Sequence, residues 1–589
     1  MELSPQIQDN KVVIKKPVKI DDVSLVMTKY EDVKDITTEE YFHNNAFSID
    51  AFKLKYTNSE NETYVQALKR VCDYIASCEA TEELQRYWSA RWFDEVYNDW
   101  WSPAGSIMQG AASTRKISLM NCTTLPFKED TIESIFETAK NVAKCAAFRQ
   151  GLGADFSVLR PRGSAVNNSS KISYGAVHWM EFIDSISYRV GQSGRLPAQL
   201  FSIQCNHPDV IEFINVKSDR TKIQNANISV QITEDFYSAV ENDTDWVLQF
   251  VVRDTGEKIS KIIRAHDLLE QIAKNMHTHA EPGVQNIDVM HKYSNSDAIG
   301  FPIISTNACS EEALDSGGCC CLSSINCDQF STHKEERSKE LEKIGVSICR
   351  FLDNVVEMEM RDKRYPTNEH YKSLEGIRRI GAGITNICGY LFKNNLSYGT
   401  LDGNKAIEEL VEEYRYNLYK ASIALGKEKG SFRAFDRAKF ETALNVQKMM
   451  KKGLEFSHMR NVETCCIAPS GCTVKETKII TNNGIKTIEA IFNENSISLN
   501  EIPSDTKQWF EPTKKIYVRD INNNMNLITK LYYNGYENTI KLLFDDDEQF
   551  IATQNHKILV KDADNNEYGI WKRLDELTTN DEVIFIQNM

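Results

Sequence analysis

The chain lacks three features that would place it in a broad class at once. Its 69 basic residues are outnumbered by 84 acidic ones, and the net charge of -15 argues against an extended nucleic-acid-binding face or an anionic membrane surface. No run of about 18 apolar residues is present, and the N-terminus lacks a secretory apolar core. We therefore expect a cytoplasmic protein without nucleic-acid or membrane partners. Nucleotides are not excluded, because one helix N-terminus can bind a phosphate.

Disulfide bonds are not expected either. The chain has 15 cysteines, and without a secretory signal we expect free thiols in a reducing compartment. About ten of them should be small buried hydrophobic residues. All but one lie between Cys72 and Cys466, and the exception is Cys472.

The pattern along the chain divides it into three parts. Residues 1–45 form a polar lead-in, residues 46–471 alternate helical and β-like signals, and residues 472–589 carry Asn-rich turns and short β-like runs. The middle part predicts a large α/β domain and the last part an all-β module.

Several segments carry these predictions. In the middle part, residues 130–151 and 406–425 are expected to be helical and residues 155–159 and 228–232 to form strands. Asp130 should cap the first helix with Glu133 completing a capping box, and Gly151 should end it. Its apolar stripe should contain Ile132, Phe136, Ala139 and Ala143. In the last part we expect a hairpin of residues 527–533 and 536–544 around Asn534-Gly535, and a short helix at residues 488–492.

Three polar residues alternate in the stretch Asn307-Ala-Cys309-Ser-Glu311. In an extended segment, residues i, i+2 and i+4 share one face, so an amide, a thiol and a carboxylate would converge. A carboxylate can take a proton from a substrate hydroxyl, the amide can hold that hydroxyl, and sulfur can do one-electron or nucleophilic chemistry. On spacing alone, the stretch is also compatible with a polar loop that holds a structural cysteine.

Two further stretches contain thiols: Cys319-Cys320-Cys321 and the β-like Leu119-Met-Asn-Cys122. Adjacent residues cannot easily all point at one ion, and no CxxC partner lies nearby, so we expect no metal site.

In their order along the chain, these three stretches resemble ribonucleotide reductase catalytic subunits. Asn307-x-Cys309-x-Glu311, followed by a Cys-x-Leu-x-Ser-Ile-Asn run, is similar to the finger loop and following strand of that family. The match of Leu322 and Asn326 places the family's redox cysteine on Cys320. The likeness covers about residues 40–471 and extends to segments such as residues 153–163, 207–213 and 225–232.

The resemblance implies a ten-stranded α/β barrel with the thiol loop inserted through its centre. It implies that Cys309 becomes a thiyl radical that abstracts the 3′ hydrogen of a ribonucleotide, that Glu311 is the base, and that Asn307 holds the 3′ hydroxyl. It further implies that Cys122 and Cys320 supply two reducing equivalents and end as a disulfide, which an external dithiol reduces again. A nucleotide effector is an expected second ligand. Two residues depart from the family pattern: Ala308 replaces the usual Pro and Ser310 the usual Gly.

The radical source is an open choice between two classes. The stretch from Pro103 to Cys122 looks more like adenosylcobalamin-dependent (class II) enzymes, and the alternative is a class I large subunit whose radical comes from a separate metal-containing subunit. The cofactor carries out radical initiation in either case, and the protein positions it.

The resemblance to the reductase stops after Pro469-Ser470-Gly471, which is similar to the family's substrate phosphate-binding turn. The following residues resemble the N-terminal half of an intein, or Hint domain. Cys472 would attack the Gly471 carbonyl to form a thioester, and Thr553 and His556 of a T-x-x-H block would activate that bond.

This organisation leaves the barrel unfinished, so we expect the isolated chain to be inactive. Either it is one polypeptide of a split intein, joined in trans to a complementary polypeptide that carries the intein C-terminal half and the rest of the reductase, or the sequence is a truncated record of a longer gene. A non-catalytic reductase-like scaffold is the competing hypothesis from another class. The joint presence of Cys122, Asn307, Cys309, Glu311 and Cys320 counts against it.

Overall fold

The computed structural model describes residues 28–42, 46–59, 61–190, 197–219 and 221–467, and beyond them only the backbone of short strands. The predicted site residues Pro469, Ser470, Gly471, Cys472 and His556 lie outside the described residues, as does the predicted helix at 488–492.

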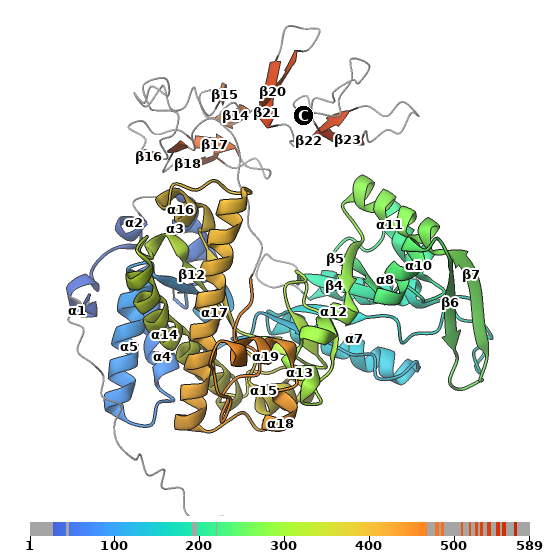
Figure 1. Ribbon diagram of the computed structural model, residues 1–589, viewed down its shortest axis with the longest axis horizontal. Helices are drawn as coiled ribbons and strands as arrows, with labels where there is room; N and C mark the ends of the chain where they lie inside the picture. Colours follow the sequence, from blue (N-terminus) through green and yellow to red (C-terminus); the bar gives the residue numbers. More distant parts are fainter. Residues whose placement is uncertain are drawn as a thin grey trace, which may run out of the picture.

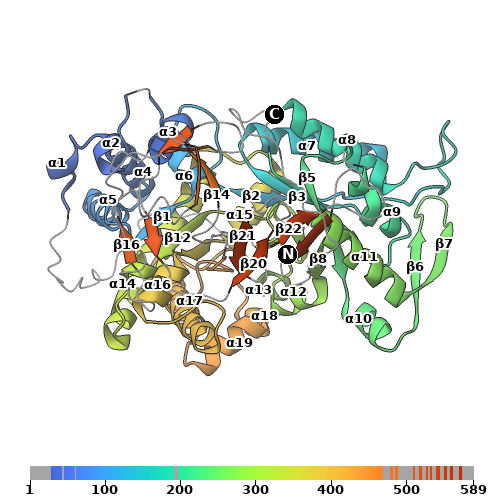
Figure 2. The ribbon, with the colours of Figure 1, turned by 90° about the horizontal axis from the view of Figure 1, so that it is seen from above.

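A six-stranded sheet in the order β11-β2-β3-β4-β5-β8 forms one half of the fold (Figures 1 and 2). Five of its strands are parallel, and β11 runs antiparallel to β2 at one edge. Helices connect the parallel strands, as a βαβ succession requires. The strands are Cys122–Thr124 (β2), Gly151–Asp155 (β3), Gln199–Gln204 (β4), Ala226–Ile232 (β5), Gly283–Asn286 (β8) and Cys319–Cys320 (β11). The expected strand at 228–232 is confirmed, whereas the expected strand at 155–159 is wrong, because β3 ends at Asp155 and the chain turns at residues 157–158.

A helical lobe packs around a second sheet, at the left of Figure 1. This sheet consists of β1 (Trp101–Pro103), β12 (Leu322–Asn326) and β13 (Gly381–Thr385). Strands β12 and β13 are parallel, and a parallel bridge from Ala382 to Cys465 extends the sheet. The lobe contains α4 (Tyr64–Ala76), α5 (Glu82–Tyr97), α14 (Lys334–Arg361) and α17 (Leu401–Lys429). Helix α17 confirms the expected helix at 406–425 and extends it at both ends.

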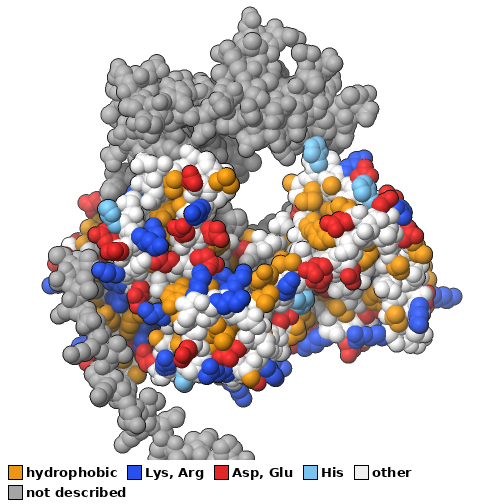
Figure 3. All heavy atoms as spheres, viewed as in Figure 1, with side chains coloured by type: hydrophobic (Ala, Val, Ile, Leu, Met, Phe, Trp, Pro, Cys, Tyr) orange, Lys and Arg blue, Asp and Glu red, His pale blue; other side chains and the backbone are white. Residues whose placement is uncertain are grey.

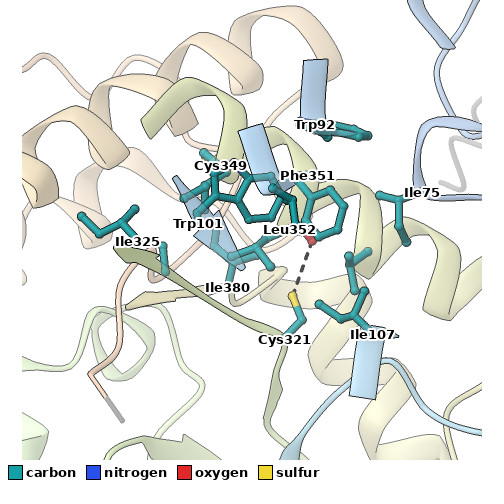
Figure 4. Packing of buried hydrophobic residues seen from close by; sticks show 14 of the residues in the cluster. Ile75, Trp92, Trp101, Ile107, Cys321, Ile325, Cys349, Phe351, Leu352 and Ile380 are labelled. Carbon is teal, nitrogen blue, oxygen red and sulfur yellow. Dashed lines mark hydrogen bonds between the residues drawn. The ribbon is translucent and has the colours of Figure 1, made fainter. Parts of the chain in front are cut away.

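Large apolar side chains fill the space between these helices and the sheet (Figure 4). The indole of Trp92 and the ring of Trp101 both meet Phe351 of α14 at steep angles, with centroids 5.0 and 4.9 Å apart. Such edge-on aromatic contacts add to the burial of apolar area. The α/β prediction is therefore confirmed for the described part of the barrel.

The remaining helices complete both halves of the fold. They are α1 (Tyr30–Val33), α2 (Thr38–Tyr41), α3 (Ala46–Lys55), α6 (Gly105–Gly110), α7 (Ile132–Ala147), α8 (Ala176–Arg189), α9 (Val210–Asn215), α10 (Glu234–Glu241), α11 (Ala265–His279), α12 (Ile287–Tyr293), α13 (Asn295–Ala298), α15 (Asn368–Ile377), α16 (Ile387–Lys393), α18 (Arg437–Phe440) and α19 (Leu444–Lys451). Strands β6 (Asp245–Val251) and β7 (Lys258–Arg264) form a separate antiparallel hairpin.

The predicted start and end of α7 are both wrong. Its N-cap is Thr131, whose hydroxyl accepts a hydrogen bond from Ser134 N, because Asp130 instead pairs with Arg160 at 2.5 Å. The helix ends at Ala147, and Gly151 belongs to β3.

The apolar stripe of α7 also differs from the prediction. Of the predicted residues, Ala139 is buried but Ile132 and Phe136 are half-exposed. The buried face of the helix also contains Ile135, Val142 and Cys145. Both sets have helical spacing, so periodicity alone could not separate them.

Beyond residue 467, every described element is a strand. The predicted hairpin around Asn534-Gly535 is wrong for the described strands: β19 (Leu531–Tyr533) pairs with β16 (Gln508–Phe510), and β20 (Thr539–Leu543) pairs with β21 (Gln549–Thr553). The other strands are β14 (Lys478–Thr481), β15 (Gly484–Thr487), β17 (Tyr517–Arg519), β18 (Met525–Leu527), β22 (Lys557–Val560) and β23 (Ile570–Arg573).

Charges of both signs are interspersed on the face shown in Figure 3.

Among the described helices, none is both long and apolar enough to cross a membrane.

A hairpin of β9 (Ile303–Thr306) and β10 (Ala313–Asp315) lies against the six-stranded sheet, which is called the half-barrel below. Polar side chains of three sheet strands bind it: Ser202 Oγ of β4 lies 2.9 Å from Ser305 Oγ, Gln231 Nε2 of β5 donates to Ile304 O at 3.2 Å, and Gln285 Nε2 of β8 donates to Thr306 Oγ1 at 2.7 Å. These buried polar groups satisfy one another and fix the position of the hairpin.

Strand β3 approaches the hairpin so closely that a side chain at residue 153 would not fit. A Cβ atom on Gly153 would lie 1.8 Å from the backbone oxygen of Thr306. On the same strand, a Cβ on Gly151 would meet its nearest atoms at 3.4 Å, an ordinary contact distance.

We expect Gly153→Ala to displace the hairpin and to lower the stability of the domain by about 1–3 kcal/mol or more, because backbone rather than a flexible side chain must move. Gly151→Ala is the matched control and should have little effect. Thermal unfolding of the two variants measures the difference. Equal unfolding midpoints for the two variants would contradict the close approach.

Candidate functional site

Cys122 and Cys320 lie directly opposite each other on neighbouring antiparallel strands, β2 and β11. Hydrogen bonds from Asn121 N to Cys320 O at 3.0 Å and from Thr124 N to Gly318 O at 3.1 Å hold the two strands in this register. Opposite residues of antiparallel strands have Cα atoms about 4.5–5.5 Å apart, within the span of a disulfide bond. Both cysteines are free thiols here, so the pair can exist in two redox states.

Cys319 and Cys321, the two neighbours of Cys320, do not point toward Cys122. Successive side chains of a strand alternate between its two faces. Cys319 and Cys321 belong to the apolar core of the helical lobe, and Cys321 Sγ lies 3.5 Å from Leu352 O of α14 (Figure 4). Of the three adjacent thiols, Cys320 is therefore the one opposite Cys122.

The tip of the β9–β10 hairpin is closed by hydrogen bonds between Asn307 and Glu312. Asn307 N donates to Glu312 O, and Glu312 N donates to Asn307 Oδ1, both at 3.0 Å. Ser310 N donates to Asn307 O at 3.1 Å, and Ser310 has a φ of 66°. The tip therefore makes a tight turn in which Ser310 adopts the left-handed conformation that favours glycine. The substitution of Ser for the usual Gly has not prevented this turn.

The tip lies close to the thiol of Cys122. The position of a Cβ on Gly151 is 3.4 Å from Ala308 Cβ and 3.6 Å from Cys122 Sγ, so the loop and the thiol meet over the same glycine. Asn227 Nδ2 of β5 also donates to Ala308 O at 3.3 Å. The hairpin thus brings residues 307–311 to the cysteine pair.

The buried polar atoms of this tip that have no hydrogen-bond partner among the described residues include Asn307 Nδ2 and Glu311 Oε2. Buried polar atoms are normally paired, so each of these requires an explanation. Cys309 lies between them in sequence and is exposed. An amide donor, a carboxylate acceptor and an accessible thiol are therefore available together for a ligand.

The thiols of the pair are held in the protonated form. Burial raises the pKa of Cys122 to about 12, with the Asn307 side chain acting in the opposite direction. Burial also raises the pKa of Cys320 far above its ordinary value, and the Glu312 carboxyl adds to this shift. Both sulfur atoms carry hydrogen near neutral pH, and the pair can deliver two electrons together with two protons.

The approach of strand β2 to this site is fixed by a buried carboxyl of the helical lobe. Glu359 of α14 accepts hydrogen bonds from Ser118 Oγ at 2.6 Å and from Leu119 N at 2.8 Å, just before β2 begins. Burial raises the pKa of Glu359 to about 7, against the effect of these two donors.

The sequence prediction missed the residues that support this site. Ser202, Gln231 and Gln285, which bind the hairpin, carry polar side chains on buried strands, and the alternation of Asn227, Ser229 and Gln231 on β5 was the available signal. Glu312 and Cys466 also lie at the site and were not singled out.

Comparison with known proteins agrees with this architecture. Residues 120–495 match the family described as "Ribonucleotide reductase, barrel domain". A vitamin B12-dependent ribonucleoside-diphosphate reductase of Thermoplasma acidophilum is 31% identical over 363 residues, which are 61% of this chain and 44% of that protein. Its counterpart in Mycobacterium tuberculosis (strain CDC 1551) is 26% identical over 407 residues, or 68% of this chain and 56% of that protein.

A third relative, the ribonucleoside-diphosphate reductase subunit alpha of Synechocystis sp., is 25% identical over 430 residues, 66% of this chain and 53% of that protein. The chain spans about half the length of these curated relatives. Because the family match covers more than half of the chain and coincides with the half-barrel, the hairpin and the second sheet, the chain belongs to the ribonucleotide reductase barrel-domain family.

Proposed function

We propose that this chain is the N-terminal part of a ribonucleotide reductase catalytic subunit that reduces a ribonucleoside diphosphate or triphosphate by thiyl-radical chemistry. One observation carries the proposal: the opposed pair Cys122 and Cys320 lies beside a hairpin tip whose Asn307 Nδ2 and Glu311 Oε2 have no partner among the described residues. A substrate hydroxyl fits both atoms, because it can accept from the amide and donate to the carboxylate.

The roles follow from the chemistry of these groups. Cys309 as a thiyl radical takes the hydrogen from C3′ of the ribose, and Glu311 takes the proton of the 3′ hydroxyl while Asn307 holds its oxygen. At the end of the turnover Cys309 returns a hydrogen atom to C3′, which restores the thiyl radical, and Glu311 returns its proton to the 3′ oxygen. Loss of the 2′ hydroxyl as water then requires two electrons and two protons. Cys122 and Cys320 supply them and become a disulfide, so that one ribonucleotide and two thiols give one deoxyribonucleotide, one disulfide and one water.

We infer adenosylcobalamin as the radical source, because two of the relatives described above are vitamin B12-dependent enzymes. The exposure of the thiols fits a large cofactor, because the thiol to be oxidised must be reachable. Cys309 is exposed at the hairpin tip, whereas Cys320 is fully buried. When bound, this cofactor would supply the radical that oxidises the Cys309 thiol. A radical from a separate metal-containing subunit is the alternative, and it would use the same Cys309.

Two further parts of the proposal concern residues outside the described ones. Pro469, Ser470 and Gly471 would bind the substrate phosphate. Cys472 and His556, together with Thr553 at the end of β21, would act in protein splicing with a complementary polypeptide that carries the rest of the reductase. The family match runs on to residue 495 and so does not mark a boundary at Cys472. The splicing proposal rests on the sequence motifs alone.

We expect Cys309→Ala to lower ribonucleotide reduction by the complete, ligated enzyme at least about a thousandfold, because the proposed radical step needs its sulfur. The variant should stay folded, because Cys309 is exposed at the hairpin tip and the change removes little buried volume. Deoxyribonucleotide formation with adenosylcobalamin and an external dithiol is the measurement. Cys319→Ala, in the core beside the redox thiol, is the matched control and should retain activity. Activity in Cys309→Ala together with its loss in Cys319→Ala would show that the assigned register is wrong.

For the junction, we expect Cys472→Ala to block ligation to a complementary intein half completely, because the attack on the Gly471 carbonyl requires the thiol of Cys472, the residue that follows that bond. His556→Ala should slow thioester formation strongly by removing the proton donor to the Cys472 amide nitrogen. Mass spectrometry of the ligated and released products measures both effects. Unchanged ligation in Cys472→Ala would contradict the splicing proposal and would leave the reductase proposal unaffected.

A further inference from the structure

Glu312 is a buried carboxyl next to the proposed redox pair that has no role in the chemistry described so far. Its side chain is 7% exposed, and its Oε2 has no hydrogen-bond partner among the described residues. Its backbone N–H and carbonyl form the two hydrogen bonds that close the hairpin tip, so the backbone position from which the side chain extends is fixed. Burying an unpaired carboxyl is costly, which makes a structural role alone a poor explanation.

The carboxyl lies beside the Cys320 thiol. Both groups border the same small space over Gly381 of β13: the position of a Cβ there is 2.7 Å from Cys320 Sγ and 2.8 Å from Glu312 Oε1. The Cys320 hydrogen thus has two acceptors nearby, the Cys321 carbonyl oxygen at 3.4 Å and the Glu312 carboxylate. The absence of a side chain at Gly381 keeps this space open for both groups.

Other charged and titratable groups surround Glu312 and Cys320. They are Glu311 in the hairpin tip, Cys122 on β2, Cys319 and Cys321 on either side of Cys320, Arg379 before β13, and Cys466 in the segment that pairs with β13. Burial raises the pKa of Glu312 above its ordinary value, while the Cys320 thiol, Arg379 and the Cys466 thiol act in the opposite direction. Arg379 is shared with Asp315, 3.6 Å away, so it does not form a dedicated ion pair with Glu312.

The two sulfur atoms of the pair differ in access. Cys122 is half-buried, whereas Cys320 is 0% exposed. In the disulfide form, an external thiolate therefore approaches from the side of Cys122, and Cys320 is the leaving sulfur. A thiolate is a poor leaving group in an apolar environment unless a proton reaches it.

We propose that Glu312 donates a proton to the sulfur of Cys320 when the Cys122–Cys320 disulfide is reduced, and takes up a proton from solvent when that disulfide forms. In the reductive step an external thiolate forms a bond to Cys122 Sγ, the Cys122–Cys320 bond breaks, and its electron pair goes to Cys320 Sγ, which receives the Glu312 proton. The second external thiol then attacks the mixed disulfide and releases Cys122 as a thiol. The external dithiol is oxidised, and Glu312 is left as a carboxylate. This inference rests on the proposed function, since it assigns a role at the same thiol pair.

The proposal fixes the sign of a pH dependence. Exchange between the protein thiol pair and a small dithiol is balanced in protons at neutral pH, so its equilibrium constant is independent of pH unless another group titrates with the redox state. Oxidation removes the Cys320 S–H that stabilises the Glu312 carboxylate, so the pKa of Glu312 is higher in the disulfide form than in the dithiol form. A lower pH therefore favours the disulfide.

The test measures that equilibrium constant on the full 589-residue chain between pH 5 and pH 8. The chain is equilibrated with reduced and oxidised dithiothreitol, free thiols are alkylated, and the peptides that carry Cys122 and Cys320 are quantified by mass spectrometry. A hydrogen bond to a charged group is worth roughly one to two pKa units, so disulfide formation should be favoured about tenfold more at pH 5 than at pH 8. In Glu312→Gln the constant should not change with pH. Asp315→Asn, which removes a neighbouring buried carboxyl of the same hairpin, should respond as the unmodified chain does.

The outcomes separate this inference from the proposed function. A Cys122–Cys320 disulfide whose equilibrium constant does not change with pH in the unmodified chain overturns the role of Glu312 and leaves the thiol pair in place, whether or not the variants fold. The same pH response in Glu312→Gln as in the unmodified chain also overturns it, because another group would then be titrating. Failure to form this disulfide in any redox buffer overturns the assignment of the pair itself.

Discussion

The site depends on the close approach of the β9–β10 hairpin to strand β3 of the half-barrel. That approach requires residue 153 to be glycine, because the Thr306 oxygen occupies the place of a side chain. Once the hairpin is seated, Ser202, Gln231 and Gln285 bind it from three strands, and its tip lies beside Cys122. A change of an ångström in this contact would move Cys309, Asn307 and Glu311 together, and rates of positioned reactions fall steeply with such shifts.

Burial determines the chemistry available to the thiols. Cys122 and Cys320 are too well buried to ionise at neutral pH, which suits hydrogen-carrying reductants and does not suit metal binding or nucleophilic attack, since both of these need the thiolate. The same burial creates a difficulty on re-reduction, when a sulfur must leave with a negative charge. A buried carboxyl beside Cys320 is a physical answer to that difficulty, and it explains why the carboxyl is present without a hydrogen-bond partner for one of its oxygens.

The sequence predicted the elements better than their details. The long helix α17 and strand β5 have strong periodic or β-branched patterns and were predicted correctly, whereas the cap and buried face of α7 depended on whether Asp130 would bind Arg160, a contact distant in sequence. Motif spacing brought out Cys309, Asn307 and Glu311 but not Glu312, because a second adjacent glutamate looks like an ordinary polar loop residue. Its position beside Cys320 arises from the packing of β13 against the hairpin and has no local signature.

The most direct test of the account is to identify the disulfide formed in a single turnover. The complete enzyme is fully reduced, freed of external dithiol, given ribonucleotide and adenosylcobalamin, and quenched with an alkylating agent before peptide mapping. The account predicts one Cys122–Cys320 disulfide for each deoxyribonucleotide formed, with Cys319 and Cys321 still alkylated as thiols. Product formed with Cys122 and Cys320 both recovered as free thiols, or with Cys319 or Cys321 in the disulfide, would contradict it.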